Sequence, residues 1–201
     1  MDLVLVRHAL PERRIVEGGT ADPPLSTAGH DQAQAVASWL ADEHFDAIFA
    51  SPLLRAQQTA APIAERLGLE VQTEDGIAEY DRQSEAYIPI EEVKQSDDPE
   101  MQAHWKALAE DRLEDLISDA HTFRPRVAEA IDRLIANHPS QRVLAVCHGG
   151  VINVALAGII GLDRSLWFEP AYVSIHRIVA SRHGIRSIKS INETQHVRGL
   201  L

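Results

Sequence analysis

Apolar residues are arranged along the chain either in short continuous runs or in longer stretches with helical spacing. Continuous runs at residues 3–6, 45–50 and 143–146 predict short strands. Residues 69–73 alternate apolar and polar positions, which predicts one more strand. A further pair of strands is predicted at 172–180 and 185–192, with its turn at His183-Gly184.

Four stretches place apolar residues on one helical face, and they cover residues 32–40, 53–67, 123–135 and 151–160. Ser26 or Thr27 is the predicted N-cap of the first helix. Gly68 and Gly161 are predicted to end the second and fourth helices. Pro62 predicts a kink or a late break in the second helix.

The alternation of strands and helices predicts an α/β fold with three layers, in which a mostly parallel central sheet carries helices on both faces. Residues 10–24 are rich in Pro, Gly and charge, which predicts a loop above the strand ends. The pattern loosens between residues 74 and 121, where one helix is predicted over 99–117. We interpret residues 80–121 as a lid inserted into a single domain of residues 1–201.

Composition limits the classes of partner. The chain of 201 residues has a formal net charge of −11 and one cysteine. The acidic balance argues against nucleic acid or an anionic membrane as a partner, since both need a basic face. No signal segment precedes the first strand, and no apolar run reaches the roughly 18 residues of a spanning helix. We therefore expect a cytoplasmic protein.

Cationic and imidazole side chains follow three of the predicted strands. Arg7-His8 follows the first strand, Arg55 lies shortly after the second, and His148 is followed by Gly149 and Gly150. Ligands of open α/β sheets bind at the carboxyl ends of the strands. Arginine matches phosphate oxygens, and a Gly-Gly pair that opens a helix lets backbone N–H groups approach an anion. The arrangement predicts a phosphate site.

The order of these motifs resembles the histidine phosphatase superfamily, also called the phosphoglycerate mutase-like family. The resemblance rests on Arg7-His8, on the Ser-Pro-x-x-Arg-Ala-x-x-Thr-Ala block at 51–60, on Glu79 and on His148-Gly149-Gly150. It spans nearly the whole chain. It implies that His8 is the phosphorylated nucleophile and that Arg7, Arg55 and His148 form the phosphate pocket.

Glu79 lies where the family carries its proton donor. That role requires a pKa raised by a partly desolvated pocket or by neighbouring carboxylates. A solvated loop glutamate is the competing interpretation, and Glu74, Asp75 and Asp81 are nearby candidates for the same donor role.

Two positions depart from the family pattern. Ala9 stands where the family usually has glycine, and Arg14 stands where relatives often place an asparagine that contacts the phosphate. Arg14 is the candidate for substrate binding here. Together with Arg13 and Arg82 it could bind a second anionic group of the substrate, or these side chains could simply be exposed.

Other residues favour structural roles. Cys147 ends a strand and is expected to be a small buried residue. Trp39 and Trp105 are predicted at helical core positions. The ten histidines include no pair with zinc-ligand spacing, so neither a metal nor another cofactor is expected.

We therefore expect a metal-independent phosphatase that hydrolyses a small phosphomonoester through a phosphohistidine at His8. A phosphoglycerate mutase-type phosphotransferase would use the same residues, although the compact lid favours hydrolysis. Two further hypotheses are a catalytically silent module that binds a phosphorylated ligand and a metal-dependent hydrolase. The sequence names no substrate and leaves open whether the chain forms a homo-oligomer.

Overall fold

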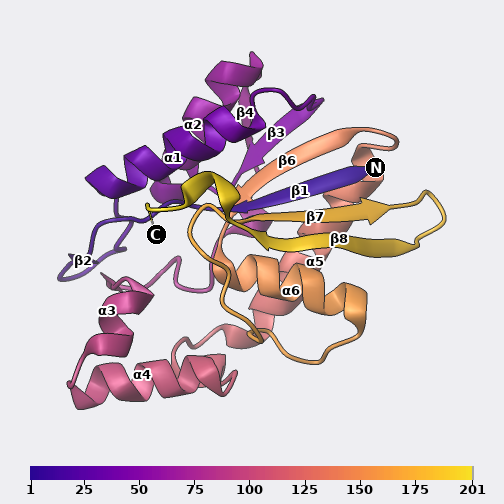
Figure 1. Ribbon diagram of the computed structural model, residues 1–201. Helices are drawn as coiled ribbons and strands as arrows, with labels where there is room; N and C mark the ends of the chain where they lie inside the picture. Colours follow the sequence, from indigo (N-terminus) through magenta and orange to yellow (C-terminus); the bar gives the residue numbers. More distant parts are fainter. Residues whose placement is uncertain (201) are drawn as a thin grey trace.

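A six-stranded sheet with the order β4-β3-β6-β1-β7-β8 runs through the computed structural model, which describes residues 1–200 (Figure 1). The four strands from β4 to β1 are parallel, β7 is antiparallel to β1, and β8 is antiparallel to β7. The mostly parallel sheet predicted from the sequence is confirmed. The strands are β1 (Asp2–Arg7), β3 (Ala47–Ala50), β4 (Val71–Thr73), β6 (Arg142–Cys147), β7 (Ile175–Ala180) and β8 (Arg186–Glu193).

Helices cover both faces of this sheet, as Figure 1 shows, with α1 (Thr27–Leu40) and α2 (Leu54–Leu67) on one face and α5 (Ala120–Asn137) and α6 (Gly149–Ile160) on the other. Strand β1 shows why two helical layers are needed. Its residues Val4 and Val6 pack with α1 and α2, whereas Leu3 and Leu5 pack with α5 and α6. A continuous apolar run is therefore explained by burial on both faces of the sheet.

The helix ends largely follow the predicted signals. Ser26 is the N-cap of α1, and its side chain accepts the Gly29 N–H at 3.0 Å. Gly68 and Gly161 end α2 and α6 with φ of 66° and 70°, a region that suits glycine. The second helix continues through Pro62 to Leu67, so the predicted late break is absent.

The prediction that Trp39 lies in the core is wrong. Its side chain is 47% exposed, although helical spacing placed it in the core. The indole ring lies 5.9 Å, centroid to centroid, from the His196 ring of the C-terminal segment, so its partner lies far away in the sequence.

The lid is more broken than predicted. It holds the short helix α3 (Ile90–Gln95), which the sequence pattern did not predict, and α4 (Pro99–Ala109). The helix predicted over 99–117 is wrong at its end, because Asp111 has φ of 60° and starts a turn. The loop at 10–24 also contains strand β2 (Arg14–Ile15), which pairs with β5 (Ala86–Tyr87). Short 3-10 helices complete the chain at η1 (Asp75–Ile77), η2 (Leu113–Asp115) and η3 (Gln195–Val197).

Within residues 1–200, none of the helices combines the length and the apolar character that crossing a membrane would require.

Candidate active site

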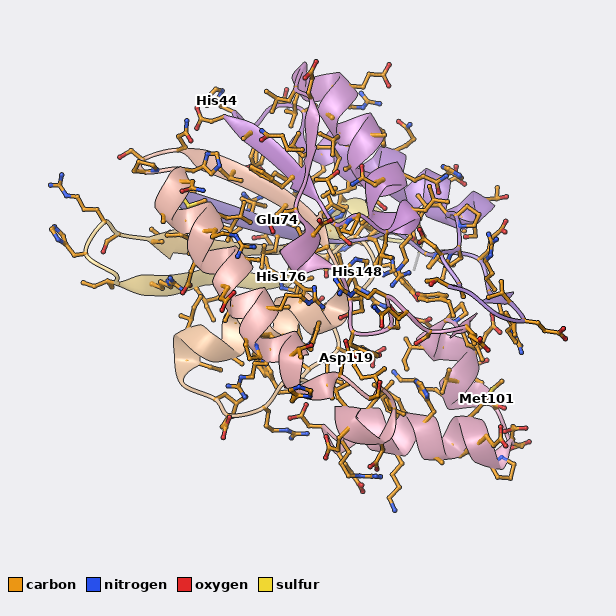
Figure 2. All side chains as sticks on the ribbon, turned by 180° about the vertical axis from the view of Figure 1, so that it is seen from behind. His44, Glu74, Met101, Asp119, His148 and His176 are labelled. Atoms are coloured by element: carbon orange, nitrogen blue, oxygen red, sulfur yellow. The ribbon has the colours of Figure 1, made fainter. Side chains whose placement is uncertain are left out.

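The candidate residues gather where β3, β6 and β1 end. These strands are adjacent and parallel, so their carboxyl ends meet at one edge of the sheet. Arg7 is the last residue of β1, His8 follows it, and His148 follows β6. Arg55 lies in the first turn of α2, after β3. All four side chains are buried, and Figure 2 shows His148 in the interior, between the helical layers.

The His8 imidazole has a fixed tautomer. Its Nδ1 lies 2.8 Å from the carbonyl oxygen of Ala9. Because a carbonyl only accepts, Nδ1 carries the hydrogen and Nε2 keeps its lone pair. Burial, followed by the charges of Arg55 and Arg7, lowers the pKa of His8 well below its usual value. The ring is therefore neutral near pH 7, with Nε2 free to act as a nucleophile.

Backbone hydrogen bonds hold this ring in place. The His8 N–H donates to the Cys147 carbonyl at 2.9 Å, which ties it to β6. The next N–H, that of Ala9, donates to Thr59 Oγ1 at 3.0 Å, and the same hydroxyl donates to the Arg55 carbonyl at 2.7 Å. Thr59 thus connects the nucleophile segment to the helix that carries Arg55.

His148 lies beside His8, with ring centroids 5.0 Å apart. Its Nε2 is 2.7 Å from Ser51 Oγ, and its buried Nδ1 has no hydrogen-bond partner among the described residues. Burial, followed by the Arg55 charge, lowers the pKa of His148 well below its usual value. If the Ser51 hydroxyl donates to Nε2, the neutral ring keeps its proton on Nδ1 and can donate it. Sequence reasoning gave Ser51 no role, although it directly follows a strand.

The two arginines are held by neighbours that leave donors unused. Arg7 Nη1 donates to the Pro170 carbonyl, and its guanidinium lies 4.0 Å from the centroid of the Tyr172 ring. Arg55 Nη2 donates to Asp81 Oδ1 at 2.8 Å. Within residues 1–200, the buried Nε atoms of Arg7 and Arg55 have no partner. Buried donors without partners are costly, so this cluster suits an anion.

Glu79 is buried in the same region, directly after η1 and Ala78. Its Oε2 accepts the Gly150 N–H at 2.8 Å, and its Oε1 accepts the Tyr80 N–H at 3.1 Å. Burial, with a smaller contribution from the Asp81 charge, raises the pKa of Glu79 to about 7. The carboxyl group can therefore hold or release a proton near neutral pH. Of the other three candidates, Glu74 pairs with Arg133 and Asp81 pairs with Arg55. Asp75 is exposed.

Gly150 makes this arrangement fit. A Cβ atom at this position would lie 2.4 Å from Glu79 Oε1, which is closer than real Cβ contacts. Gly149 is less confined, with Arg7 Nε 3.8 Å from its hypothetical Cβ. The absence of a side chain at Gly150 therefore lets the Glu79 carboxylate approach the start of α6, whereas a Cβ at Gly149 would make only ordinary contacts.

A cavity of about 660 Å³ begins at these residues and extends beneath the lid. Its lining includes Arg7, His8, Arg55 and Glu79. Arg14 is not brought to it: within the part of the chain that the structure describes, Arg13 belongs to the lining, whereas Arg14 lies exposed on β2 and Arg82 lies outside the lining.

The remaining titratable groups do not extend this chemistry. Cys147 is buried, and burial raises the pKa of its thiol well above the usual value, so the sulfur stays protonated. Among residues 1–200, no three His, Cys, Asp or Glu side chains gather in a way that could hold a metal ion.

Known proteins match this chain over most of its length. A family model described as "Histidine phosphatase superfamily (branch 1)" matches residues 3–194. Phosphoserine phosphatase 1 of Hydrogenobacter thermophilus is 33% identical over 169 residues, which cover 83% of this chain and 80% of that protein.

Solved structures share the fold over almost the whole chain. A mutant phosphoserine phosphatase from Entamoeba histolytica, in complex with phosphoserine, superposes with a TM-score of 0.74 at 24% identity and covers 98% of both chains. The alpha-ribazole phosphatase from Shigella flexneri gives a TM-score of 0.70 at 25% identity and covers 96% of both chains.

Proposed function

The chain belongs to the histidine phosphatase superfamily, and from this premise we propose that it is a phosphatase that hydrolyses a phosphomonoester through a covalent intermediate on His8. One observation carries the proposal. A buried neutral imidazole, with its hydrogen held on Nδ1, lies among buried cationic and N–H donors and near a carboxyl group whose pKa is about 7.

The first step transfers the phosphoryl group to the enzyme. The lone pair of His8 Nε2 attacks phosphorus, and the bond between phosphorus and the ester oxygen breaks with its electron pair going to that oxygen. Protonated Glu79 donates its proton to the leaving oxygen, which departs as the alcohol. The Arg7 and Arg55 guanidiniums neutralise the charge on the equatorial oxygens, and His148 Nδ1 donates a hydrogen bond to them.

The second step returns the enzyme to its starting state. Glu79, now a carboxylate, accepts a proton from a water molecule that attacks phosphorus. The P–N bond breaks, its electron pair returns to Nε2, and inorganic phosphate leaves. A pKa of about 7 suits a group that must act as an acid and then as a base.

The test is the release of inorganic phosphate from a panel of small phosphomonoesters, measured with a chelator present throughout. Wild type is expected to release phosphate, and His8→Ala is expected to release none. His44→Ala is the matched control, because the His44 side chain is 82% exposed and lies far from His148 (Figure 2).

Three results would contradict the proposal. Undiminished release by His8→Ala would exclude a phosphohistidine at this position. Loss of activity with the chelator would indicate a metal-dependent hydrolase. Transfer of the phosphoryl group between positions of phosphoglycerate, with little release of phosphate, would identify a mutase.

A further inference from the structure

The cavity is much larger than a phosphoryl group needs. Its volume of about 660 Å³ lies within the range of sites that enclose whole organic ligands. The phosphate end accounts for one part of the lining. Much of the rest comes from α3, α4 and the segment that joins α6 to β7, and smaller parts come from β2, β5 and the residues after η2. In the proposed phosphatase, this outer part is where the alcohol portion of the substrate would lie, so its chemistry bears on which alcohol is accepted.

One wall of the outer part is an aromatic pair whose backbone is hydrogen-bonded to helix α6. The rings of Trp167 and Phe168 lie 4.6 Å apart, centroid to centroid, and both line the cavity. Buried Asn153 of α6 holds their backbone, because its Oδ1 accepts the Trp167 N–H at 2.8 Å and the Phe168 N–H at 3.0 Å. Its Nδ2 donates to the carbonyls of Gly149 and Phe168, both at 2.9 Å.

This network has a consequence for binding. Every polar atom of the Asn153 side chain is used, and one of its bonds reaches the first residue of α6 beside the phosphate end. The aromatic wall is therefore placed relative to the reacting atoms before a ligand arrives. Preorganised apolar surface gives more affinity than surface that must first be ordered.

The lid supplies further apolar lining. Met101, Trp105 and Leu108 of α4 line the cavity together with Val93 of α3. Figure 2 shows Met101 on α4, well away from His148, so the apolar lining extends far from the phosphate end. Lys94 does not offer its charge to the cavity. Its ammonium lies 4.7 Å from the centroid of the Trp105 ring and pairs with Glu169.

Of the two arginines that line this outer part, one has an acidic partner and the other is hydrogen-bonded to a backbone carbonyl. Arg13 pairs with Glu92 at 3.4 Å, and Arg164 donates to the Ala109 carbonyl at 3.1 Å. The lining there also holds three carboxylates, those of Asp98, Glu100 and Glu169. Glu169 is already paired with Lys94, and the partner of Arg164 is a neutral carbonyl. Among the described lining residues, Asp98 and Glu100 therefore outnumber Arg164 as charges without an ionic partner, so a second anionic group on the substrate would meet net negative charge.

We propose that the substrate is the phosphomonoester of a bulky apolar alcohol that carries no second anionic group. This inference rests on the proposed phosphatase function and adds the substrate class. The apolar part of the alcohol lies against Trp105 and the Trp167–Phe168 pair. Phosphoserine and phosphoglycerate, which carry a carboxylate, are poor substrates.

The experiment compares three alkyl phosphates with the His8-dependent assay: 3-phenylpropyl phosphate, ethyl phosphate and phosphoserine. All three are esters of primary alcohols, so leaving-group chemistry contributes little to the differences. We expect kcat/KM for 3-phenylpropyl phosphate to exceed that for ethyl phosphate by about 10- to 100-fold, from burial of the phenyl group. Phosphoserine is expected to be no better than ethyl phosphate.

Variants locate the effect. Trp105→Ala should lower the ratio of kcat/KM for 3-phenylpropyl phosphate to that for ethyl phosphate about tenfold. This ratio does not depend on the fraction of the variant that is folded. Trp39→Ala is the matched control, because that indole is exposed on α1 outside the cavity. In Trp39→Ala the ratio of kcat/KM for 3-phenylpropyl phosphate to that for ethyl phosphate should equal the ratio in wild type.

The outcomes separate the two proposals. Preference for phosphoserine, or an equal loss on both alkyl phosphates in Trp105→Ala, overturns the substrate class while the phosphatase stands. If no compound releases phosphate, the phosphatase proposal fails, and calorimetric binding to His8→Ala then tests the substrate class alone. Tighter binding of 3-phenylpropyl phosphate than of phosphoserine supports it, and the reverse order refutes it.

Discussion

The role of Glu79 can be tested by removing its proton while keeping its shape, in the variant Glu79→Gln. Burial is the main cause that raises the pKa of this carboxyl group from its usual value of 4.5 to about 7. At pH 7 about half of the molecules then hold the proton, whereas a pKa of 4.5 would leave it on only about one molecule in 300. The buried position therefore multiplies the population of the acid form more than a hundredfold.

The expected loss depends on the leaving group. An alkoxide needs the proton as it departs, and a positioned general acid contributes about 10²- to 10⁴-fold. Glu79→Gln should lower kcat/KM for ethyl phosphate by that factor. Nitrophenolate departs without a proton, so p-nitrophenyl phosphate should lose much less.

The role of Glu79 as an acid also predicts the direction in which activity changes with pH. Protonated Glu79 is the active form in the first step, and kcat/KM reports that step. The ratio of kcat/KM for ethyl phosphate to that for p-nitrophenyl phosphate should therefore fall about tenfold per pH unit above pH 7 in wild type. Taking the ratio removes most ionisations that the two reactions share, including that of His8. In Glu79→Gln the ratio should be low and independent of pH.

The measurement is initial phosphate release between about pH 5 and pH 9 at substrate concentrations below KM. An equal loss on both substrates would refute the reasoning, since it would assign Glu79 a structural or binding role. A wild-type ratio that does not change across neutral pH would also refute it, because the carboxyl group would then not titrate in that range.

The contacts around Glu79 also set the response to three other changes. Gly150→Ala should lower activity and destabilise the fold by about 1–3 kcal/mol in denaturant melts, because its Cβ would lie 2.4 Å from Glu79 Oε1. The control Gly158→Ala, whose Cβ meets no atom within 4 Å, should not destabilise the fold in the same melts. Asp81→Asn removes a charge that raises the pKa of Glu79, so the alkaline decline should move to lower pH, and an unchanged midpoint would contradict this. A carboxyl whose pKa is raised on folding binds protons more tightly in the native state, so wild type should lose about 3 kcal/mol of stability relative to Glu79→Gln as pH rises from 4.5 to 7, measured by urea unfolding.

Much of the site could be predicted from the sequence because its residues adjoin strong local signals. Arg7 ends an apolar strand, His8 directly follows it, and His148 lies between a strand and a glycine pair. Parallel strand ends converge at one edge of a sheet, so adjacency to a strand end becomes proximity in space. The raised pKa expected for Glu79 is likewise found, and burial with Asp81 is its physical cause.

Other features depend on contacts that no local pattern encodes. The hydrogen bond between Ser51 and His148 joins residues that are 97 positions apart, and that between Ala9 and Thr59 joins residues 50 apart. The ring nearest to the exposed Trp39 is that of His196 in the C-terminal segment, a contact that helical spacing cannot predict.

The lid is the least predictable part. The single helix predicted over 99–117 is divided into α4 and η2, because a residue with positive φ interrupts it at Asp111, and α3 before it was not predicted. An aspartate in that conformation is uncommon and is set by its surroundings, here by the N–H groups of Ser165 and Leu166, which donate to its carboxylate.

The close approach of Glu79 to Gly150 also constrains how this site can change over generations. A side chain at position 150 can be inherited only together with a shorter residue at position 79, since the full-length carboxyl group occupies the space of a Cβ atom. Neither substitution is favourable alone: the first displaces the carboxyl group and the second withdraws it from the Gly150 N–H. The two positions should therefore vary as a pair across related sequences. Sequences that lack the glutamate at position 79 should be the ones in which a residue larger than glycine stands at position 150.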